Sequence, residues 1–203
     1  MLLPDPRRAY KMRRIRQRIR ELGPRSALLF EDETDLLLFP PLRACWAKRG
    51  RSAEVPLSGR NARRVLFGAL HVHTGHRVLL ARPHNWGEDF RAFLRLLHEQ
   101  YRGWEVVLLL DENSSHTAKD SQALAQEYAI ELLWLPKRCP EWNAMDHLGG
   151  DAKDEVCANH QAPAIDDLVD SFIRYIHGLS AEEVLRKAGI LSEDFWLKNE
   201  CDI

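Results

Sequence analysis

Short apolar runs along the chain predict the strands of a sheet. The run 105–110 is apolar at every position after its first residue, which is typical of a strand buried on both faces. A four-residue turn at 73–76, with Gly75 near its tip, predicts a hairpin between its flanking strands. The predicted strands, the first two of which form another hairpin, are 26–30, 36–39, 65–72, 77–81, 105–110 and 130–135.

Longer stretches carry apolar residues at the three- and four-residue spacing of helices that bury one face. Ser180 and Glu183 form a capping box that marks the start of the last of these helices. The predicted helices are 6–22, 85–102, 118–128, 144–159, 164–177 and 180–188. Hairpins followed by alternating helices and strands predict an α/β fold in which helices flank a mixed sheet.

Composition narrows the class of protein. The 203 residues are 45% hydrophobic, which is enough for a folded core. Apolar runs of about five residues are too short to cross a membrane, and no leader-like apolar stretch begins the chain, so we expect a cytoplasmic protein. The four cysteines lie far apart, which predicts reduced thiols. His71, His73 and His76 would point to mixed faces of a strand, so we expect no metal site there.

The near-neutral net charge of −1 hides two oppositely charged ends. Residues 1–26 hold nine basic and two acidic residues, whereas residues 151–203 hold twelve acids and five bases. A basic segment of this kind indicates either nucleic-acid binding or a solvated helix. A second basic stretch carries Arg43, Lys48, Arg49, Arg51, Arg60, Arg63 and Arg64 against a single acid.

Three aspartates stand at the ends of predicted strands or helices, where they could converge on one site. Asp32 and Asp111 stand at the ends of predicted strands, and Asp146 stands at the start of a predicted helix. Each alone is consistent with a solvated turn. Together, converging carboxylates repel unless a hard cation such as Mg²⁺ or Mn²⁺ neutralises them. Two such ions about 3.5–4 Å apart can activate the attacking oxygen and stabilise the leaving oxygen in phosphodiester chemistry.

Several motifs carry a family resemblance over residues 26–160. They are Phe30-Glu-Asp-Glu-Thr34, Trp46-Ala-Lys-Arg-Gly50, Val65-Leu-Phe-Gly-Ala-Leu70 with Thr74-Gly75, Leu110-Asp-Glu-Asn113 with His116, and Leu135-Pro136 followed by Cys139-Pro-Glu-Trp-Asn143 and Met145-Asp-His-Leu148. The 34 residues between Asp111 and Asp146 match the interval of the same family. The sequence resembles the catalytic domain of bacterial insertion-sequence transposases of the mariner superfamily, insertion sequence family 630.

The resemblance implies a ribonuclease H-like fold with a DDE/D catalytic triad of Asp32, Asp111 and Asp146 that binds two Mg²⁺ or Mn²⁺ ions. It also implies double-stranded DNA as substrate, at the element ends and the target, and a homodimer at the bacterial nucleoid. We expect a basic linker helix at 1–25, the catalytic domain at 26–160, and C-terminal helices at 161–203 packed on it.

Four further residues are expected to support the triad, and one more to contact DNA. Glu33 should face away from Asp32 because strand side chains alternate. Asn113 and His116 match the motif after the second aspartate, where they orient substrate or brace a turn, and Asn143 precedes the third aspartate. Lys153 lies seven residues after Asp146, on the same helix face, and is expected to bind phosphate together with the seven bases of 43–64.

Two departures from the family pattern leave other functions open. After Asp146-His147-Leu148 the family usually has a tryptophan, whereas this sequence has Gly149 and Gly150. Two glycines within a helix predict that the helix around Asp146 is frayed. The helix-turn-helix region that recognises terminal repeats is expected to be missing. An inactive DNA-binding or dimerisation module, or a stand-alone ribonuclease H-like nuclease, are therefore the alternatives. Trp104 and Trp134 are expected in the core, and Trp142 is the tryptophan considered for DNA contact.

Overall fold

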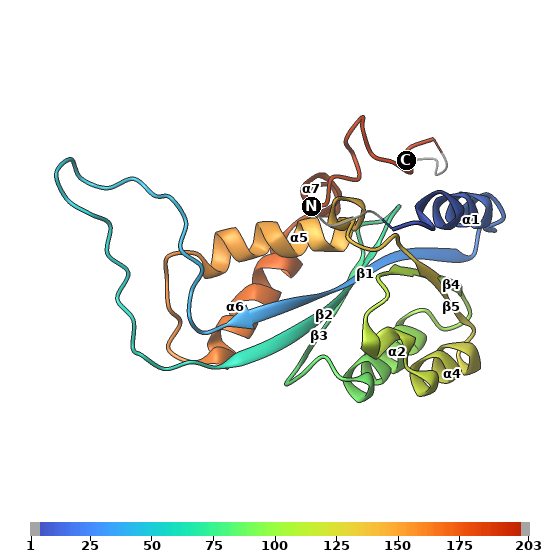
Figure 1. Ribbon diagram of the computed structural model, residues 1–203, viewed down its shortest axis with the longest axis horizontal. Helices are drawn as coiled ribbons and strands as arrows, with labels where there is room; N and C mark the ends of the chain where they lie inside the picture. Colours follow the sequence, from blue (N-terminus) through green and yellow to red (C-terminus); the bar gives the residue numbers. More distant parts are fainter. Residues whose placement is uncertain (1–4, 200–203) are drawn as a thin grey trace.

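A five-stranded mixed sheet forms the centre of the computed structural model, which describes residues 5–199 (Figure 1). The strands are ordered β3-β2-β1-β4-β5. β1 pairs antiparallel with β2 and parallel with β4, so the long central strand joins the two halves. The strands are β1 Ser26–Leu37, β2 Arg63–His71, β3 Arg77–Arg82, β4 Glu105–Leu110 and β5 Ile130–Trp134.

Helices cover both faces of this sheet, which confirms the predicted fold class (Figure 1). α2 and α4 lie on one face, while α5 and α6 lie on the other. The helices are α1 Arg8–Arg20, α2 Gly87–Gln100, α3 Ser114–Thr117, α4 Lys119–Glu127, α5 Ala144–Ala152, α6 Ile165–Gly178 and α7 Ala181–Lys187. None of the described helices is long and apolar enough to cross a membrane.

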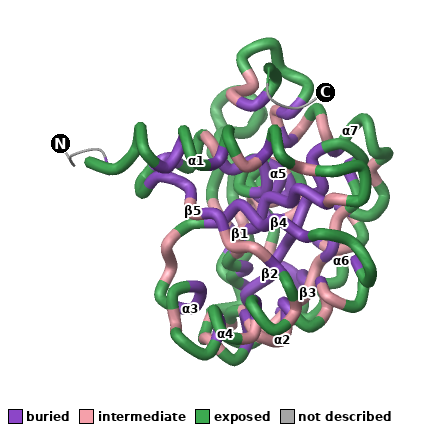
Figure 2. Tube along the Cα trace, turned by 90° about the vertical axis from the view of Figure 1, so that its right-hand side faces the viewer, coloured by how far each residue is buried: buried purple, intermediate pink, exposed green. Residues whose placement is uncertain are grey.

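Alternation along β1 separates two hydrophobic cores. Leu28 and Phe30 pack toward α1, α5 and α6, whereas Ala27 and Leu29 pack toward α2. The central strands are accordingly buried over most of their length (Figure 2). Because side chains of a strand alternate between faces, the same pattern decides where the polar residues that follow will point.

The predicted hairpin between 26–30 and 36–39 is wrong. Residues Ser26–Leu37 form a single strand, which pairs with β4 over its first part and with β2 over its second. The polar residues in the middle of this strand resemble a turn in sequence, but β2 pairs with them throughout. Residues 38–62 form a long excursion without helix or strand (Figure 1).

The predicted fraying around Gly149 and Gly150 is also wrong. α5 runs through both glycines to Ala152 and continues as a π-helical turn, Lys153–Cys157. Gly149 lies against β1, where a Cβ atom would come within 2.5 Å of Thr34 Oγ1. The absence of a side chain therefore lets α5 approach the strand closely.

The basic N-terminal helix packs on the sheet. α1 buries Met12, Ile15 and Ile19 in the core beneath it. Lys11 is also buried and forms ion pairs with Asp5 (2.8 Å) and Glu112 (2.7 Å). Part of its positive charge is thus neutralised within the protein, and α1 is an integral element of the fold.

Two further predictions concern the burial of two tryptophans and the state of the cysteines. Trp104 is 43% exposed, so its predicted place in the core is wrong, while Trp134 is half-buried. Cys45, Cys139 and Cys157 are free thiols, and Cys201 lies outside the described residues.

Candidate active site

The fold brings Asp32, Asp111 and Asp146 to one pocket. Asp32 lies within β1 and not at its end, but the parallel pairing of Phe30 with Leu109 places it level with Asp111, which follows β4 directly. Asp146 lies in the first turn of α5. The pocket has a volume of about 270 Å³ and is also lined by Leu135, Pro136, Arg138, Cys139, Pro140 and Asn143.

Asn143 fixes the start of α5 against β1. Its side-chain oxygen accepts a hydrogen bond from the Met145 backbone N–H (3.1 Å) and caps the helix. Its Nδ2 donates to the backbone oxygen of Glu31 (2.8 Å), directly before Asp32. This buried side chain therefore joins the two elements that carry the first and third aspartates.

Gly68 is a residue of the site that sequence reasoning missed. It pairs with Asp32 across β1 and β2, and a Cβ atom here would lie 2.3 Å from Met145 Cε. The missing side chain makes room for Met145 beside the first aspartate. The glycine stood within the quoted motif 65–70, but nothing local in the sequence indicated which side chain approaches it.

Burial and electrostatic repulsion both act on Asp32. Burial, followed by the negative charges of Asp146, Glu33 and Asp111, raises the pKa of Asp32 to about 8. A divalent cation would relieve this repulsion, and carboxylates are the ligands that Mg²⁺ prefers. The residues present therefore fit such an ion.

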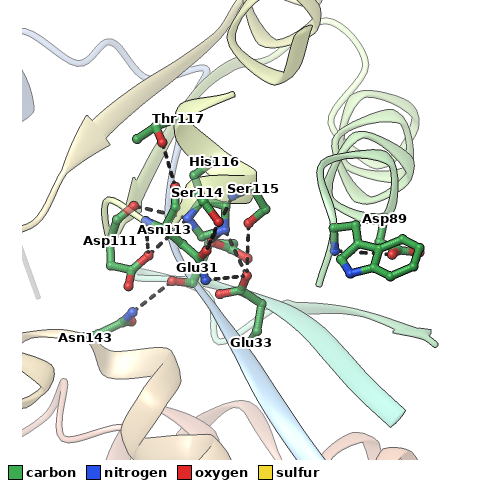
Figure 3. Close-up of polar contacts among 11 residues, drawn as sticks. Glu31, Glu33, Asp89, Asp111, Asn113, Ser114, Ser115, His116, Thr117 and Asn143 are labelled. Atoms are coloured by element: carbon green, nitrogen blue, oxygen red, sulfur yellow. Dashed lines mark hydrogen bonds and ion pairs between the residues drawn. The ribbon is translucent and has the colours of Figure 1, made fainter. Parts of the chain in front are cut away.

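Asp111 is held as a carboxylate by its neighbours (Figure 3). Burial raises its pKa, but the hydrogen bond and charge of His116 and the backbone N–H of Asn113 outweigh burial, so the pKa of Asp111 is lowered. Asn113 N–H donates to Asp111 Oδ1 (2.9 Å), and His116 Nδ1 lies 3.1 Å from the same oxygen. The second aspartate is thereby fixed in orientation.

Glu33 and His116 meet on the other face of β1. His116 Nε2 lies 3.2 Å from Glu33 Oε1 and 3.5 Å from Glu31 Oε2. Asn113 Nδ2 also donates to Glu33 (3.4 Å). Glu31 was missed in sequence reasoning, although its position two residues before Glu33 places both on one face.

The predicted DNA-binding residues lie apart from this pocket. Arg43, Lys48, Arg49, Arg51 and Arg60 lie on the 38–62 excursion, and Arg63 and Arg64 begin β2. Three of them form exposed ion pairs: Arg43 with Asp154, Arg63 with Asp35, and Arg64 with Asp166. Lys153 lines a different pocket, with Asp35 and Phe39. Arg138, which was not predicted, is the basic residue that lines the aspartate pocket.

Trp142, the tryptophan considered for DNA contact, packs within the protein. Its ring stacks on Trp196, with centroids 5.7 Å apart, and the Arg8 guanidinium lies 4.2 Å from its centroid. These contacts connect the segment before α5 to both the N-terminal and the C-terminal parts of the chain.

Comparison with known proteins agrees with this geometry. The profile of the DDE superfamily endonuclease family matches residues 27–169. An insertion element IS630 uncharacterized 39 kDa protein from Shigella sonnei is 26% identical over 178 residues, which are 87% of this chain and 52% of that protein. The chain thus spans about half the length of the curated relative it matches.

Solved structures show the same fold. The Mos1 transposase paired-end complex with left transposon end superposes with a TM-score of 0.70 and 16% identity, covering 93% of this chain and 59% of that one. The catalytic domain of Mos1 mariner transposase superposes with a TM-score of 0.63 and 17% identity, covering 93% and 88%. The resemblance to mariner-superfamily transposases is confirmed, and the family match spans all three aspartates. The chain belongs to the DDE superfamily endonuclease family.

Proposed function

We propose that this chain is the catalytic domain of a transposase that cleaves DNA at the ends of an insertion element and joins it to a target. The observation that carries the proposal is the convergence of Asp32, Asp111 and Asp146 on one pocket, where burial and mutual repulsion raise the pKa of Asp32 to about 8. Family membership alone would not separate an active from an inactive copy, but a retained and electrostatically strained triad supports an active one.

The three aspartates would hold two divalent ions, Mg²⁺ or Mn²⁺. Structures of the Mos1 paired-end complex are described with each of these metals. Bound ions would supply activation of the attacking oxygen and neutralisation of the phosphate charge. The chain's own part is positioning: His116 and Asn113 orient Asp111, while Asn143 holds Asp146 beside β1.

DNA would be bound by the bases of the 38–62 excursion and the adjoining β2. Lys48, Arg49 and Arg51 are exposed there, and Arg43, Arg63 and Arg64 exchange weak surface ion pairs for phosphate contacts at little cost. Lys153 extends this surface, while the exposed arginines of α1 form a second basic region at the opposite end of the molecule (Figure 1). Binding through such contacts falls steeply with salt and is largely independent of sequence.

The expected partner is double-stranded DNA, bound by a homodimer at the bacterial nucleoid. Support comes from the relatives: Mos1 is described in complex with transposon ends, in a paired-end assembly.

Nicking of supercoiled plasmid DNA in Mg²⁺ or Mn²⁺ tests the proposal without knowledge of the element ends. The wild-type chain should nick the plasmid, chelation should stop it, and Asp111→Asn or Asp146→Asn should reduce nicking by at least about 100-fold. Asp120→Asn is the matched control, because Asp120 is exposed on α4 and lies outside both the pocket and the proposed DNA-binding surface. Metal-independent DNA binding without nicking would overturn the catalytic proposal in favour of the inactive module.

A further inference from the structure

A buried polar cluster lies behind the aspartate pocket, on the opposite face of β1. Among the described residues it is the one group of three acidic, histidine or cysteine side chains whose ligand atoms all lie within 4.8 Å of one another: Glu31, Glu33 and His116. Figure 3 shows the two glutamates and the imidazole directed toward a common point.

The buried groups of this cluster lie within ion-pair distance of one another, but no hydrogen bond joins them. Glu31 is fully buried, and neither of its carboxylate oxygens has a hydrogen-bond partner. His116 Nε2, also buried, has none either. A buried carboxylate without a hydrogen bond costs several kcal/mol, so this arrangement requires a positive charge among the three side chains, either the protonated imidazole or a cation.

The distances match a metal site better than a hydrogen-bonded pair. Nε2 lies 3.2 Å and 3.5 Å from the two carboxylate oxygens but does not direct its N–H position at either of them. Ligands placed about 2.0–2.1 Å from a tetrahedral Zn²⁺ are separated by about 3.3–3.4 Å, with each lone pair aimed at the ion and not at the next ligand.

The tautomer of His116 is fixed from its other side. Nδ1 lies 3.1 Å from both the backbone oxygen and Oδ1 of Asp111, two acceptors that place the hydrogen on Nδ1. Without metal, burial is outweighed by the neighbouring carboxylates, which raise the pKa of His116 to about 11 and keep a second hydrogen on Nε2. A metal ion would displace that proton, and the lone pair thus freed points into the cluster. A histidine that donates one ring N–H to a carboxylate and binds a metal with the other nitrogen is a common arrangement in metalloproteins.

We propose that Glu31, Glu33 and His116 bind one divalent transition-metal cation of the Zn²⁺ type, separate from the ions of the aspartate triad. One imidazole nitrogen with two carboxylates suits Zn²⁺, Mn²⁺ or Co²⁺, whereas Mg²⁺ prefers oxygen ligands alone. Asn113 and Ser115 donate long hydrogen bonds to Glu33 and hold it in place. The Phe90 ring packs on the imidazole, with centroids 4.4 Å apart, and closes the site on the α2 side.

Co²⁺ provides a spectroscopic test, since four-coordinate Co²⁺ absorbs strongly in the visible. The full chain, stripped of metal with chelator, is titrated with Co²⁺ alone. We expect a saturable visible band at one equivalent, lost in Glu31→Gln and in Glu33→Gln. Glu99→Gln, an exposed position on α2, is the control. Far-UV circular dichroism confirms folding of each variant, and Glu33→Gln carries the test if Glu31→Gln does not fold.

The same titration distinguishes metal binding at the cluster from metal binding at the aspartate triad. Asp146→Asn should keep the band while losing plasmid nicking, which distinguishes failure of this proposal from failure of the proposed function. The proposal is overturned if folded wild-type protein shows no band, if the band survives Glu33→Gln, or if Asp146→Asn removes it. In the first case the cluster holds only a proton on the imidazole.

Discussion

The two faces of β1 use carboxylates in opposite ways. Asp32 points to a pocket that opens toward solvent and shares it with two other aspartates, so its charge is destabilised until a cation arrives. Glu31 and Glu33, one residue to either side, point to a closed cluster around His116. Because side chains alternate along a strand, the solvent-open aspartate pocket and the buried cluster around His116 lie on opposite faces of β1.

Of the substitutions considered, removal of the His116 imidazole should lower the free energy of unfolding the most. His116→Ala leaves Glu31 and Glu33 buried without a counter-charge, and we expect a loss of about 3–5 kcal/mol in the free energy of unfolding. Urea denaturation measures it. His147→Ala is the control, because His147 forms a single long hydrogen bond, to the Ala188 backbone oxygen (3.3 Å). Equal losses in the two variants would mean that the cluster has no special role.

Removing the charge of Asp32 should instead raise the free energy of unfolding. The pKa of Asp32 is raised from 3.8 to about 8, so the folded state binds a proton more tightly than the unfolded state does. Without metal, wild-type stability should therefore fall as the pH rises from about 4 to about 8. Asp32→Asn should be flatter over this range and more stable by up to about 5 kcal/mol at pH 8.

Thermal unfolding in chelator, across that pH range, checks this prediction. Asp35→Asn, three residues further along β1, should follow the wild-type profile because Asp35 is exposed. A wild-type profile identical to that of Asp32→Asn would show that the aspartates do not repel one another as described.

The packing of α5 on the Asp32 face can be tested with neighbouring glycines. Gly149→Ala would drive a Cβ into Thr34 Oγ1, and we expect a loss of about 2 kcal/mol. A Cβ atom at Gly150 would meet nothing within 4 Å, so Gly150→Ala should gain up to about 1 kcal/mol from helix propensity. Chemical denaturation of both variants measures the difference, and a neutral Gly149→Ala would contradict the close approach.

Asn143 connects α5 to β1, and its removal should have the smallest effect on stability. Asn143→Ala loses the cap of α5 and the hydrogen bond to the Glu31 backbone, for a cost of about 1–2 kcal/mol. Plasmid nicking should fall more than stability does, because Asp146 is displaced. Asn143→Asp, which keeps the cap, should restore part of the stability; no difference between the two variants would argue against capping.

Local patterns predicted most of the secondary structure. The apolar run of β4 and the capping box at Ser180 are confirmed, because each depends on neighbours in sequence. The hairpin at 36–39 failed since polar residues within β1 look like a turn until β2 pairs with them. The close approach of Gly149 to Thr34 depends on contacts 115 residues apart, which no local pattern reveals.

Some residues of the candidate site could likewise be predicted from the sequence, and others could not. The three aspartates were found through their spacing and family motif, and the structure brings them to one pocket. Glu31 and Gly68 were missed because their roles depend on which element packs against their face of the sheet. Charge patterns also overstated the free basic surface, since Lys11 and Arg18 are engaged with acidic partners.

The most direct test of the account is thermal unfolding with and without Mg²⁺, for wild type and Asp146→Asn. Mg²⁺ favours all-oxygen ligands, so it reports on the aspartate pocket and not on the histidine-containing cluster. Free Mg²⁺ at ten times its dissociation constant should stabilise wild-type protein by about 1.4 kcal/mol, and Asp146→Asn should lose this gain. Equal stabilisation of both proteins, or none in folded wild type, would contradict a cation site formed by the three aspartates.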